Sequence, residues 1–301
     1  KQLGKLIVGQ SEDESKLQSI YEKAQRNGVE DISWLSKKEI TLMEPELSIS
    51  HALLSPSTGI IDVHSFLQAL EGDVNSNNGQ LAVNSRFVRA ENNNLNSSWK
   101  VWISADKEVE ELEISCNFLI NSAGLDADAV ANSIIGNEKK NVPQIYFAKG
   151  NYVSLTKSCP FSHLIYPTPV SGGLGTHLTL DMGGQGQFGP DVEWLMPADK
   201  SRPPGSMTEK FDYNVNEEKI KKFADDVRRW WPELSPNDLA PAYSGIRPKL
   251  NSKNEAPADF FIQGPAQHNL PGLINLFGIE SPGLTASLAI AKHVIKLINN
   301  K

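Results

Sequence analysis

The sequence holds one histidine in a setting suited to proton transfer. In GLGTHLTLDMG (173–183), strand alternation places Leu178 and Leu180 on one face and His177, Thr179 and Asp181 on the other. A histidine titrates near neutral pH, so His177 is the candidate for a general base. A polar strand face is also often simply hydrated, and both readings stay open at this point.

A second candidate is an arginine flanked by strand-breaking residues. YSGIRPKL (243–250) sets Arg247 two residues after Gly245 and directly before Pro248. A fixed guanidinium binds a carboxylate through two parallel hydrogen bonds, a geometry that lysine cannot reproduce. Arg247 therefore has two readings: a carboxylate-binding group or a hydrated strand residue.

Two strand-to-helix joins are built from small residues. LFGIESPGLTASLAIAKHVIKLINN (276–300) passes from an apolar strand through Gly278 to a helix that Ser281 could cap, with Pro282 at its first position. The same helix start presents unpaired N–H groups, which favour an anion or a cofactor edge. FLINSAGLDADAVA (118–131) repeats the pattern with Ala123 and Gly124, and Asp126 is suited to cap the next helix.

The G-x-G-x-x-G match at 184–189 (GQGQFG) is weak. Pro190 follows at once, and neither a long helix nor a suitably spaced acidic residue completes a dinucleotide-binding fingerprint. This segment is predicted to be a mobile glycine turn.

The composition limits the class of protein. A formal net charge of −7 without a basic block argues against nucleic-acid binding. No apolar run approaches the roughly 20 residues of a membrane span. Cys116 and Cys159 lack metal-ligand spacing, so no metal site and a reducing compartment are expected. Because the chain begins at Lys1 without a targeting segment, we expect a fragment or processed product.

The order of predicted elements indicates a mixed α/β architecture. Helix-and-strand pieces stand at both ends, and short strands between Gly and Pro turns, from about residue 144 to 181, predict an antiparallel sheet in the middle.

Several stretches together resemble one flavoprotein family. GKLIVG, LLSPSTGIIDVHSFLQAL, INSAGLDADAVA, AKGNYVSL, LGTHLTLDMGGQGQFGPDVEWL, YSGIRPKL and LFGIESPGLTASLAIAKHV occur in family order from Gly4 onward. They resemble the FAD-dependent L-2-hydroxyglutarate dehydrogenases of the D-amino-acid-oxidase-like group.

The resemblance implies a fold and a domain order. It implies a Rossmann-like FAD/NAD(P)-binding domain, N-terminally truncated, joined to an antiparallel-sheet substrate domain. Residues 1–50 would be part of the substrate domain and 51–142 part of the FAD-binding domain. Residues 143–242 would form the antiparallel substrate domain, and 243–301 would return to the FAD-binding domain with the C-terminal helix.

The resemblance also implies an activity and roles for residues. FAD would accept a hydride from L-2-hydroxyglutarate, a small 2-hydroxy dicarboxylate, to give 2-oxoglutarate. Arg247 would bind the C1 carboxylate and His177 would be the base; if it is not, tyrosines such as Tyr152 and Tyr243 are the alternatives. The cofactor-binding residues implied are Phe87, Ala123, Gly124, Gly278, Ser281, Gly283, Leu284 and Thr285.

The family's N-terminal G-x-G-x-x-G unit, which supplies the pyrophosphate site, is missing from this sequence. Two alternatives therefore stay open: a related amine oxidase of the glycine- or sarcosine-oxidase kind, and a truncated product that does not bind FAD. The resemblance implies a mitochondrial location. It leaves the electron acceptor open among a quinone, an electron-transfer flavoprotein and oxygen.

Overall fold

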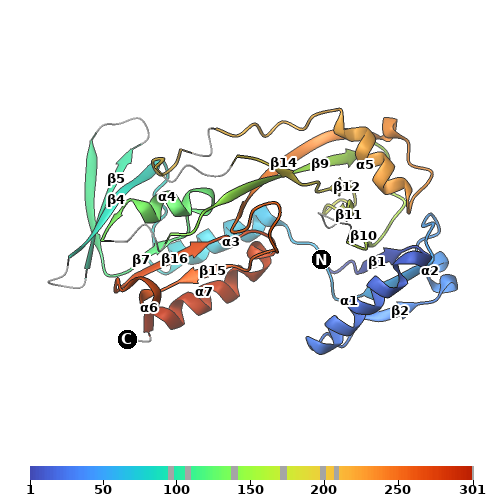
Figure 1. Ribbon diagram of the computed structural model, residues 1–301, viewed down its shortest axis with the longest axis horizontal. Helices are drawn as coiled ribbons and strands as arrows, with labels where there is room; N and C mark the ends of the chain where they lie inside the picture. The colour runs from blue at the N-terminus through green and yellow to red at the C-terminus, as the bar shows by residue number, and fades with distance from the viewer. Residues whose placement is uncertain are drawn as a thin grey trace. The chain divides into compact units, whose positions relative to one another are not determined.

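The computed structural model describes residues 1–93, 98–105, 110–136, 142–169, 175–196, 201–206 and 210–299. Contacts divide the chain into two compact units (Figure 1). The first comprises Lys1–Gln80, Gly150–Val192 and Tyr213–Gly245, and the second Leu81–Lys149, Glu193–Asp212 and Ile246–Lys301. Residues 51–80 thus cluster with the first unit, whereas the family resemblance implied a boundary after residue 50. The cofactor and substrate roles of the units stay predictions.

Nine strands of the described chain form one mixed sheet in the order β13-β9-β12-β11-β10-β1-β3-β2, with β14 also paired to β9. Strands β1 and β10 pair in parallel, and the pairs that link β10, β11, β12, β9 and β13 are antiparallel, as predicted for the middle of the chain. The strands are β1 (Lys5–Gly9), β2 (Ser33–Leu35), β3 (His51–Ser55), β9 (Tyr146–Leu155), β10 (Leu164–Pro167), β11 (His177–Leu180), β12 (Gly186–Gly189), β13 (Glu193–Trp194) and β14 (Leu239–Lys249).

The glycine segment at 184–189 differs from its prediction. A turn lies before Gly186: the Asp181 side chain accepts hydrogen bonds from the N–H groups of Gly183 and Gln185, at 2.8 and 2.9 Å. Gly186–Gly189 is strand β12, paired with β11 on one side and β9 on the other. The prediction of a mobile turn over the whole segment was therefore wrong.

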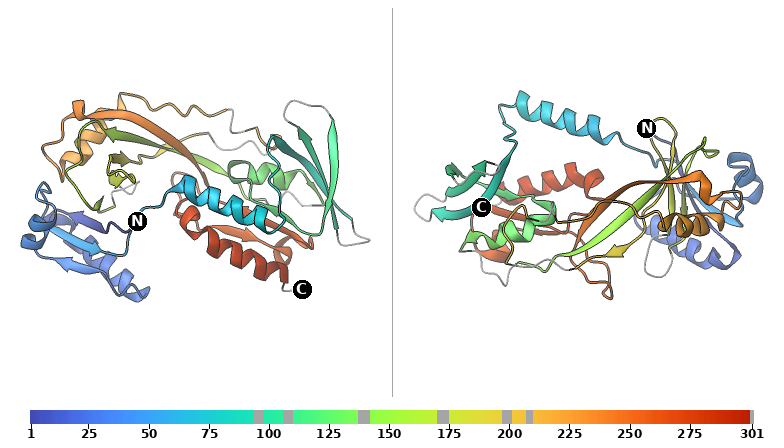
Figure 2. Two further views of the ribbon diagram at one scale, coloured as in Figure 1. Left: turned by 180° about the vertical axis from the view of Figure 1, so that it is seen from behind. Right: turned by 90° about the horizontal axis from the view of Figure 1, so that it is seen from above.

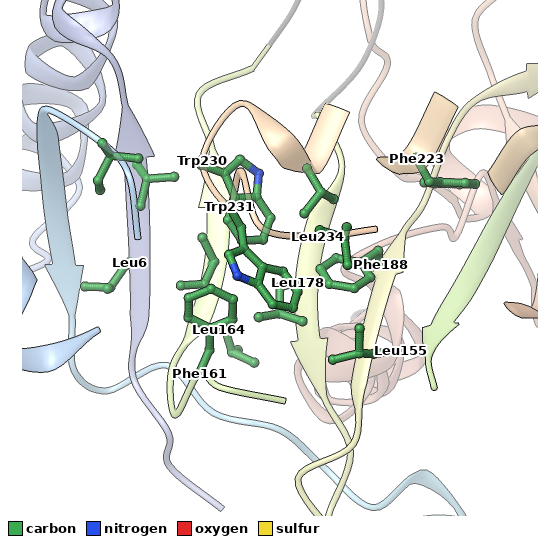
Figure 3. Packing of buried hydrophobic residues seen from close by; sticks show 14 of the residues in the cluster. Leu6, Leu155, Phe161, Leu164, Leu178, Phe188, Phe223, Trp230, Trp231 and Leu234 are labelled. Carbon is green, nitrogen blue, oxygen red and sulfur yellow. The ribbon is translucent and has the colours of Figure 1, made fainter. Parts of the chain in front are cut away.

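Two hydrophobic clusters hold the first unit. The larger one packs α5 (Lys219–Arg228) and the Trp230-Trp231 pair onto β10, β11 and β12 (Figure 3). Its strand residues include Ile165, Leu178 and Phe188, each fully buried. The second cluster packs Leu17 of α1 (Glu14–Arg26) against β3. The other helices of this unit are η1 (Ser11–Asp13), α2 (Lys37–Met43), α3 (Val63–Ser76) and η4 (Pro236–Asp238).

The second unit contains two smaller sheets. A three-stranded sheet has the order β15-β16-β7, and a four-stranded sheet the order β6-β5-β4-β8. Their elements are β4 (Ser85–Asn93), β5 (Ser98–Ala105), β6 (Glu111–Cys116), β7 (Leu119–Asn121), β8 (Ile134–Ile135), β15 (Phe261–Gln263) and β16 (Leu273–Phe277). The helices are η2 (Gly124–Asp126), α4 (Ala127–Asn132), α6 (Pro265–His268) and α7 (Gly283–Asn299).

Helix α7 runs along the three-stranded sheet (Figures 1 and 2). Only Gly283 and Val294 of this helix are buried. Within the described part of the chain, no helix is both long and apolar enough to cross a membrane. The same residues contain no group of three or more His, Cys, Asp or Glu side chains that could hold a metal ion.

Candidate active site

His177 lies on the sheet face opposite the large core cluster. Its neighbours Leu178 and Leu180 are buried in that cluster, so the predicted alternation along β11 is confirmed. His177 stacks on Tyr166 of β10, with 3.7 Å between ring centroids and 11° between ring planes. The stack leaves only 8% of His177 exposed. Asp181, expected beside it, lies beyond the end of the strand and serves the turn described above.

Two tyrosines extend this face across the sheet. Tyr152 of β9 stacks on Tyr243 of β14, with ring centroids 4.5 Å apart. Gly189 of β12 is paired with His177 on one side, and Phe188 with Val153 on the other, so Gly189 lies between His177 and Tyr152. We call Tyr243, Tyr152, His177 and Tyr166 the aromatic row.

Gly189 makes room for the aromatic row. Its φ is +138°, and a Cβ there would come within 2.7 Å of the Asn151 carbonyl oxygen and 2.9 Å of the Tyr152 ring. The glycine is therefore required by both backbone conformation and close approach.

Tyr166 and Tyr243 are hydrogen-bond donors at neutral pH. Burial, and secondarily the nearby Tyr152, raises the pKa of Tyr166 and of Tyr243 above the ordinary value for tyrosine. A phenol with a raised pKa keeps its proton at pH 7. Tyr243, one of the alternative bases, is therefore better suited to orienting a ligand than to accepting a proton.

The two small-residue joins meet at one edge of the three-stranded sheet. Strands β7 and β16 are parallel neighbours, with Asn121 opposite Asn275. Parallel strands end at the same edge of a sheet. Ala123-Gly124, which follow β7, and Gly278, which follows β16, therefore lie at one edge. Ligands of open α/β sheets bind at such an edge. A line of buried amides fixes this pairing: Asn121 Nδ2 donates to Asn275 Oδ1, and Asn275 Nδ2 donates to Gln263 Oε1, each at 3.0 Å.

The two glycines are required for different reasons. Gly124 has a φ of +57°, and a Cβ there would meet nothing within 4 Å, so its backbone faces open space. Gly278 has a φ of +67°, and its Cβ would lie 2.6 Å from Leu250. Only the Gly124 backbone is thus open to a ligand; Gly278 is explained by conformation and by packing on Leu250.

Helix α7 starts one residue later than predicted. It begins at Gly283, and its first bond runs from the Ala286 amide to the Pro282 carbonyl, so Pro282 precedes the helix and Ser281 is not its N-cap. The Gly283 amide already donates to Glu280, at 2.5 Å. Among the described residues, the amides of Leu284 and Thr285 have no acceptor. They are the groups free to meet an anion.

An arginine that local sequence patterns did not reveal holds the segment after Gly124. Arg202, 3% exposed, donates to both carboxylate oxygens of Asp128 at 2.8 and 2.6 Å, and to the Leu125 carbonyl at 2.8 Å. Asp126 makes no cap hydrogen bond to α4, contrary to expectation, and lies 3.6 Å from Arg202. The 74 positions between Arg202 and Asp128 explain why no sequence pattern signals the pair.

Arg247 is a half-buried residue of β14. Its side chain has no hydrogen-bond or ion-pair partner among the described residues, whereas Lys249, two residues on, binds Glu280 at 2.5 Å. A guanidinium removed in part from water without a counter-charge is suited to binding a carboxylate ligand.

The predicted residues divide between the units. His177 belongs to the first unit. Arg247 and all the predicted cofactor residues, including half-buried Phe87 of β4, belong to the second. Phe87 packs on the core of the four-stranded sheet. Sequence reasoning missed Tyr166, whose partner His177 is close in space only because β10 and β11 pair.

Comparisons with known proteins show which proteins this chain is similar to. The chain is 39% identical to the mitochondrial L-2-hydroxyglutarate dehydrogenase of Arabidopsis thaliana, over 98% of its own length and 66% of that protein's. It is 27% identical to a glycerol 3-phosphate dehydrogenase of Caloramator mitchellensis, over 100% of its length and 57% of that protein's. The chain thus spans less than two thirds of these two relatives.

A solved structure shares the fold. The reduced L-alpha-glycerophosphate oxidase of Mycoplasma pneumoniae with FAD bound superposes with a TM-score of 0.81 and 23% identity, covering 100% of this chain and 74% of that one. The model of the DAO family, described as FAD dependent oxidoreductase, matches residues 1–297. The resemblance found in the sequence is confirmed: the chain belongs to the FAD dependent oxidoreductase family.

Proposed function

We propose that this chain carries the substrate-binding residues, and part of the cofactor-binding residues, of an enzyme that oxidises L-2-hydroxyglutarate to 2-oxoglutarate. The observation that carries the proposal is the 39% identity to the Arabidopsis L-2-hydroxyglutarate dehydrogenase, which extends over 98% of the chain. The identity to the glycerol 3-phosphate dehydrogenase is lower, at 27%, so glycerol 3-phosphate is less well supported as the substrate.

The residues present fit a flavin dinucleotide. Ala123 and Gly124 would border it where the Gly124 backbone is open, and the amides of Leu284 and Thr285 would face its anionic edge. Bound FAD would accept the hydride from C2 of the substrate. The N-terminus of α7, with its partial positive charge, would stabilise the negative charge that results.

Arg247 would bind the C1 carboxylate. Its half-buried guanidinium, which has no partner in the part of the chain that the structure describes, would offer two parallel N–H groups to the two carboxylate oxygens. This contact would hold C2 and its hydroxyl in one orientation, which is a major part of the catalytic effect of a binding group.

His177 would take the hydroxyl proton. The alcohol loses a hydride and a proton in becoming a ketone, and an imidazole is suited to receive the proton near neutral pH. Stacking on Tyr166 fixes the plane of the ring, so only the ring edge would face the substrate. The Tyr243 hydroxyl would donate a hydrogen bond to the substrate.

A mitochondrial location is part of the proposal, because relatives from a plant, nematodes and mammals are named as mitochondrial proteins. A quinone, an electron-transfer flavoprotein and oxygen all remain candidate acceptors.

Anaerobic flavin reduction tests the proposal. The protein, expressed with any sequence that precedes residue 1 in its gene, should be yellow and should lose its flavin absorbance with L-2-hydroxyglutarate. Glycerol 3-phosphate, glycine and sarcosine, added separately, should leave the flavin oxidised. Bleaching by one of these three in place of L-2-hydroxyglutarate would assign a different substrate. A colourless protein that takes up no added FAD would end the proposal.

A further inference from the structure

Lys5 of β1 is a half-buried cation next to the aromatic row. Its Nζ lies 5.1 Å from the centroid of the Tyr166 ring. Strand β10, which carries Tyr166, lies between β1 and β11, so the Tyr166 ring separates Lys5 from His177.

Lys5 shares a sheet face with the aromatic row. Leu6 and Val8, its neighbours in the alternation, are buried in the large core cluster on the other face. The distances from the Tyr166 centroid to Lys5 Nζ and to the His177 ring are 5.1 and 3.7 Å. The ammonium and the imidazole therefore lie within the span of one small molecule.

The Lys5 ammonium has no counter-charge among the residues that the structure describes. Burial lowers the pKa of Lys5 below the ordinary value for lysine. Two other lysines of the first unit do have a counter-charge: Lys16 pairs with Asp13 and Lys157 with Asp238, at 2.8 and 2.7 Å. A desolvated cation that lacks an anion is costly unless a ligand supplies one.

We propose that Lys5 binds the distal carboxylate of a dicarboxylate substrate and so determines specificity for substrates with two carboxylates. The inference rests on the proposed function and adds to it the group for the second carboxylate. Lys5 would contact the end of the substrate that is remote from the reacting carbon. A lysine suits the distal carboxylate, because a point charge on a flexible side chain can follow a carboxylate whose position varies with the conformation of the substrate.

The alternative role is structural: the cation could simply stabilise the Tyr166 ring by a cation–π contact. The two roles differ in what they do to substrate preference. A structural contact affects all substrates alike, whereas a carboxylate-binding group affects only those with a distal carboxylate.

The test compares L-2-hydroxyglutarate with L-2-hydroxypentanoate, which has the same carbon chain but a methyl group in place of the distal carboxylate. The flavin-loaded protein and Lys5→Met are assayed for kcat/KM on both. The ratio of the two kcat/KM values should fall on the order of 100-fold in Lys5→Met, as expected when one partner of a buried charge pair is lost. Lys5→Arg should restore part of the ratio.

Lys157→Met is the matched control. Lys157 also lies over an aromatic ring, with its Nζ 5.2 Å from the Trp231 centroid, but Trp231 belongs to the core cluster on the α5 side. The ratio of the two kcat/KM values in Lys157→Met should equal that of the wild type. Flavin content and melting temperature, measured on every variant, show that each has folded.

The outcomes separate the two proposals. If the wild type does not oxidise L-2-hydroxyglutarate, the proposed function fails and the role of Lys5 falls with it. If the wild type is active and Lys5→Met keeps the wild-type ratio, the role of Lys5 alone is wrong. An equal loss on both substrates would assign Lys5 to the structural contact.

Discussion

Tyr166 and His177 stack in parallel on paired strands, with 3.7 Å between their ring centroids. The imidazole is therefore held by its flat face, and its 8% of exposed surface limits the directions from which a substrate can approach. A base held in this way needs no reorientation when the substrate binds, which favours catalysis by positioning.

Replacing His177 with Gln should lower kcat/KM by roughly 10²–10⁴-fold, the effect expected for a lost acid–base group. Glutamine keeps polarity and much of the volume but cannot accept a proton at neutral pH. A base must be neutral to act, so wild-type kcat/KM should fall as pH decreases, and His177→Gln should flatten this acid limb. Stopped-flow flavin reduction across pH measures both effects.

The slope of the wild-type profile decides between two roles for His177. A protonated His177 that binds a carboxylate would give the opposite slope, with activity falling as pH rises. Unchanged reduction rates in His177→Gln at every pH would remove the residue from the reaction and direct attention to Tyr152.

Replacing Arg247 with Lys should lower kcat/KM by the equivalent of about 2–5 kcal/mol, because lysine cannot form the two-point contact with a carboxylate. Flavin content should stay normal. Arg89→Lys is the control: Arg89 is a partly exposed residue of β4 that pairs with Glu111, and its replacement should be nearly silent. Equal activity in the two variants would make Arg247 a hydrated strand residue.

Replacing Gly189 with Ala should lower the free energy of unfolding by about 1–3 kcal/mol, because the new Cβ would overlap the Asn151 carbonyl and the Tyr152 ring. Gly184→Ala isolates the cost of the backbone conformation, since Gly184 has a φ of +87° and open space around it. Urea unfolding of both variants gives the difference. If Gly189→Ala is no less stable than Gly184→Ala, the close approach to Tyr152 is not what requires the glycine.

Replacing Arg202 with Met should destabilise the protein by about 3–5 kcal/mol, because it leaves the Asp128 carboxylate buried without its partner. The double variant Arg202→Met/Asp128→Leu should recover much of this loss, since it removes the stranded charge. Denaturant unfolding of the wild type, Arg202→Met, Asp128→Leu and the double variant forms the test. Simple addition of the two single losses would show that the pair is not coupled.

Local patterns predicted the parts of this structure that depend on neighbours in sequence. The alternation along 177–180, and the small residues that end β7 and β16, each involve a few consecutive positions. The meeting of Gly124 and Gly278 at one sheet edge was not predicted from these patterns; it follows from the parallel pairing of β7 and β16 in the structure.

Long-range contacts account for what was missed. Lys5 lies near Tyr166, and Glu44 accepts a hydrogen bond from the His163 amide, 119 positions away. Both contacts exist because segments distant in sequence pack together. The glycines of 184–189 were assigned to a mobile turn because Pro190 and the lack of a following helix ruled out a dinucleotide-binding fingerprint. Here one of them instead makes room for Tyr152, which is a property of the partner strand.

The amides of Asn121, Asn275 and Gln263 give the three-stranded sheet a single permitted alignment. Sliding β16 by one residue would turn Asn275 to the opposite face and bury an aliphatic side chain where its amide now lies. The amides of Asn121 and Gln263 would then both lose a partner inside the protein. The spacing between the ends of β7 and β16 is thus encoded by polar side chains within otherwise apolar strands. A deletion in one strand could be accommodated only by a compensating change in the other.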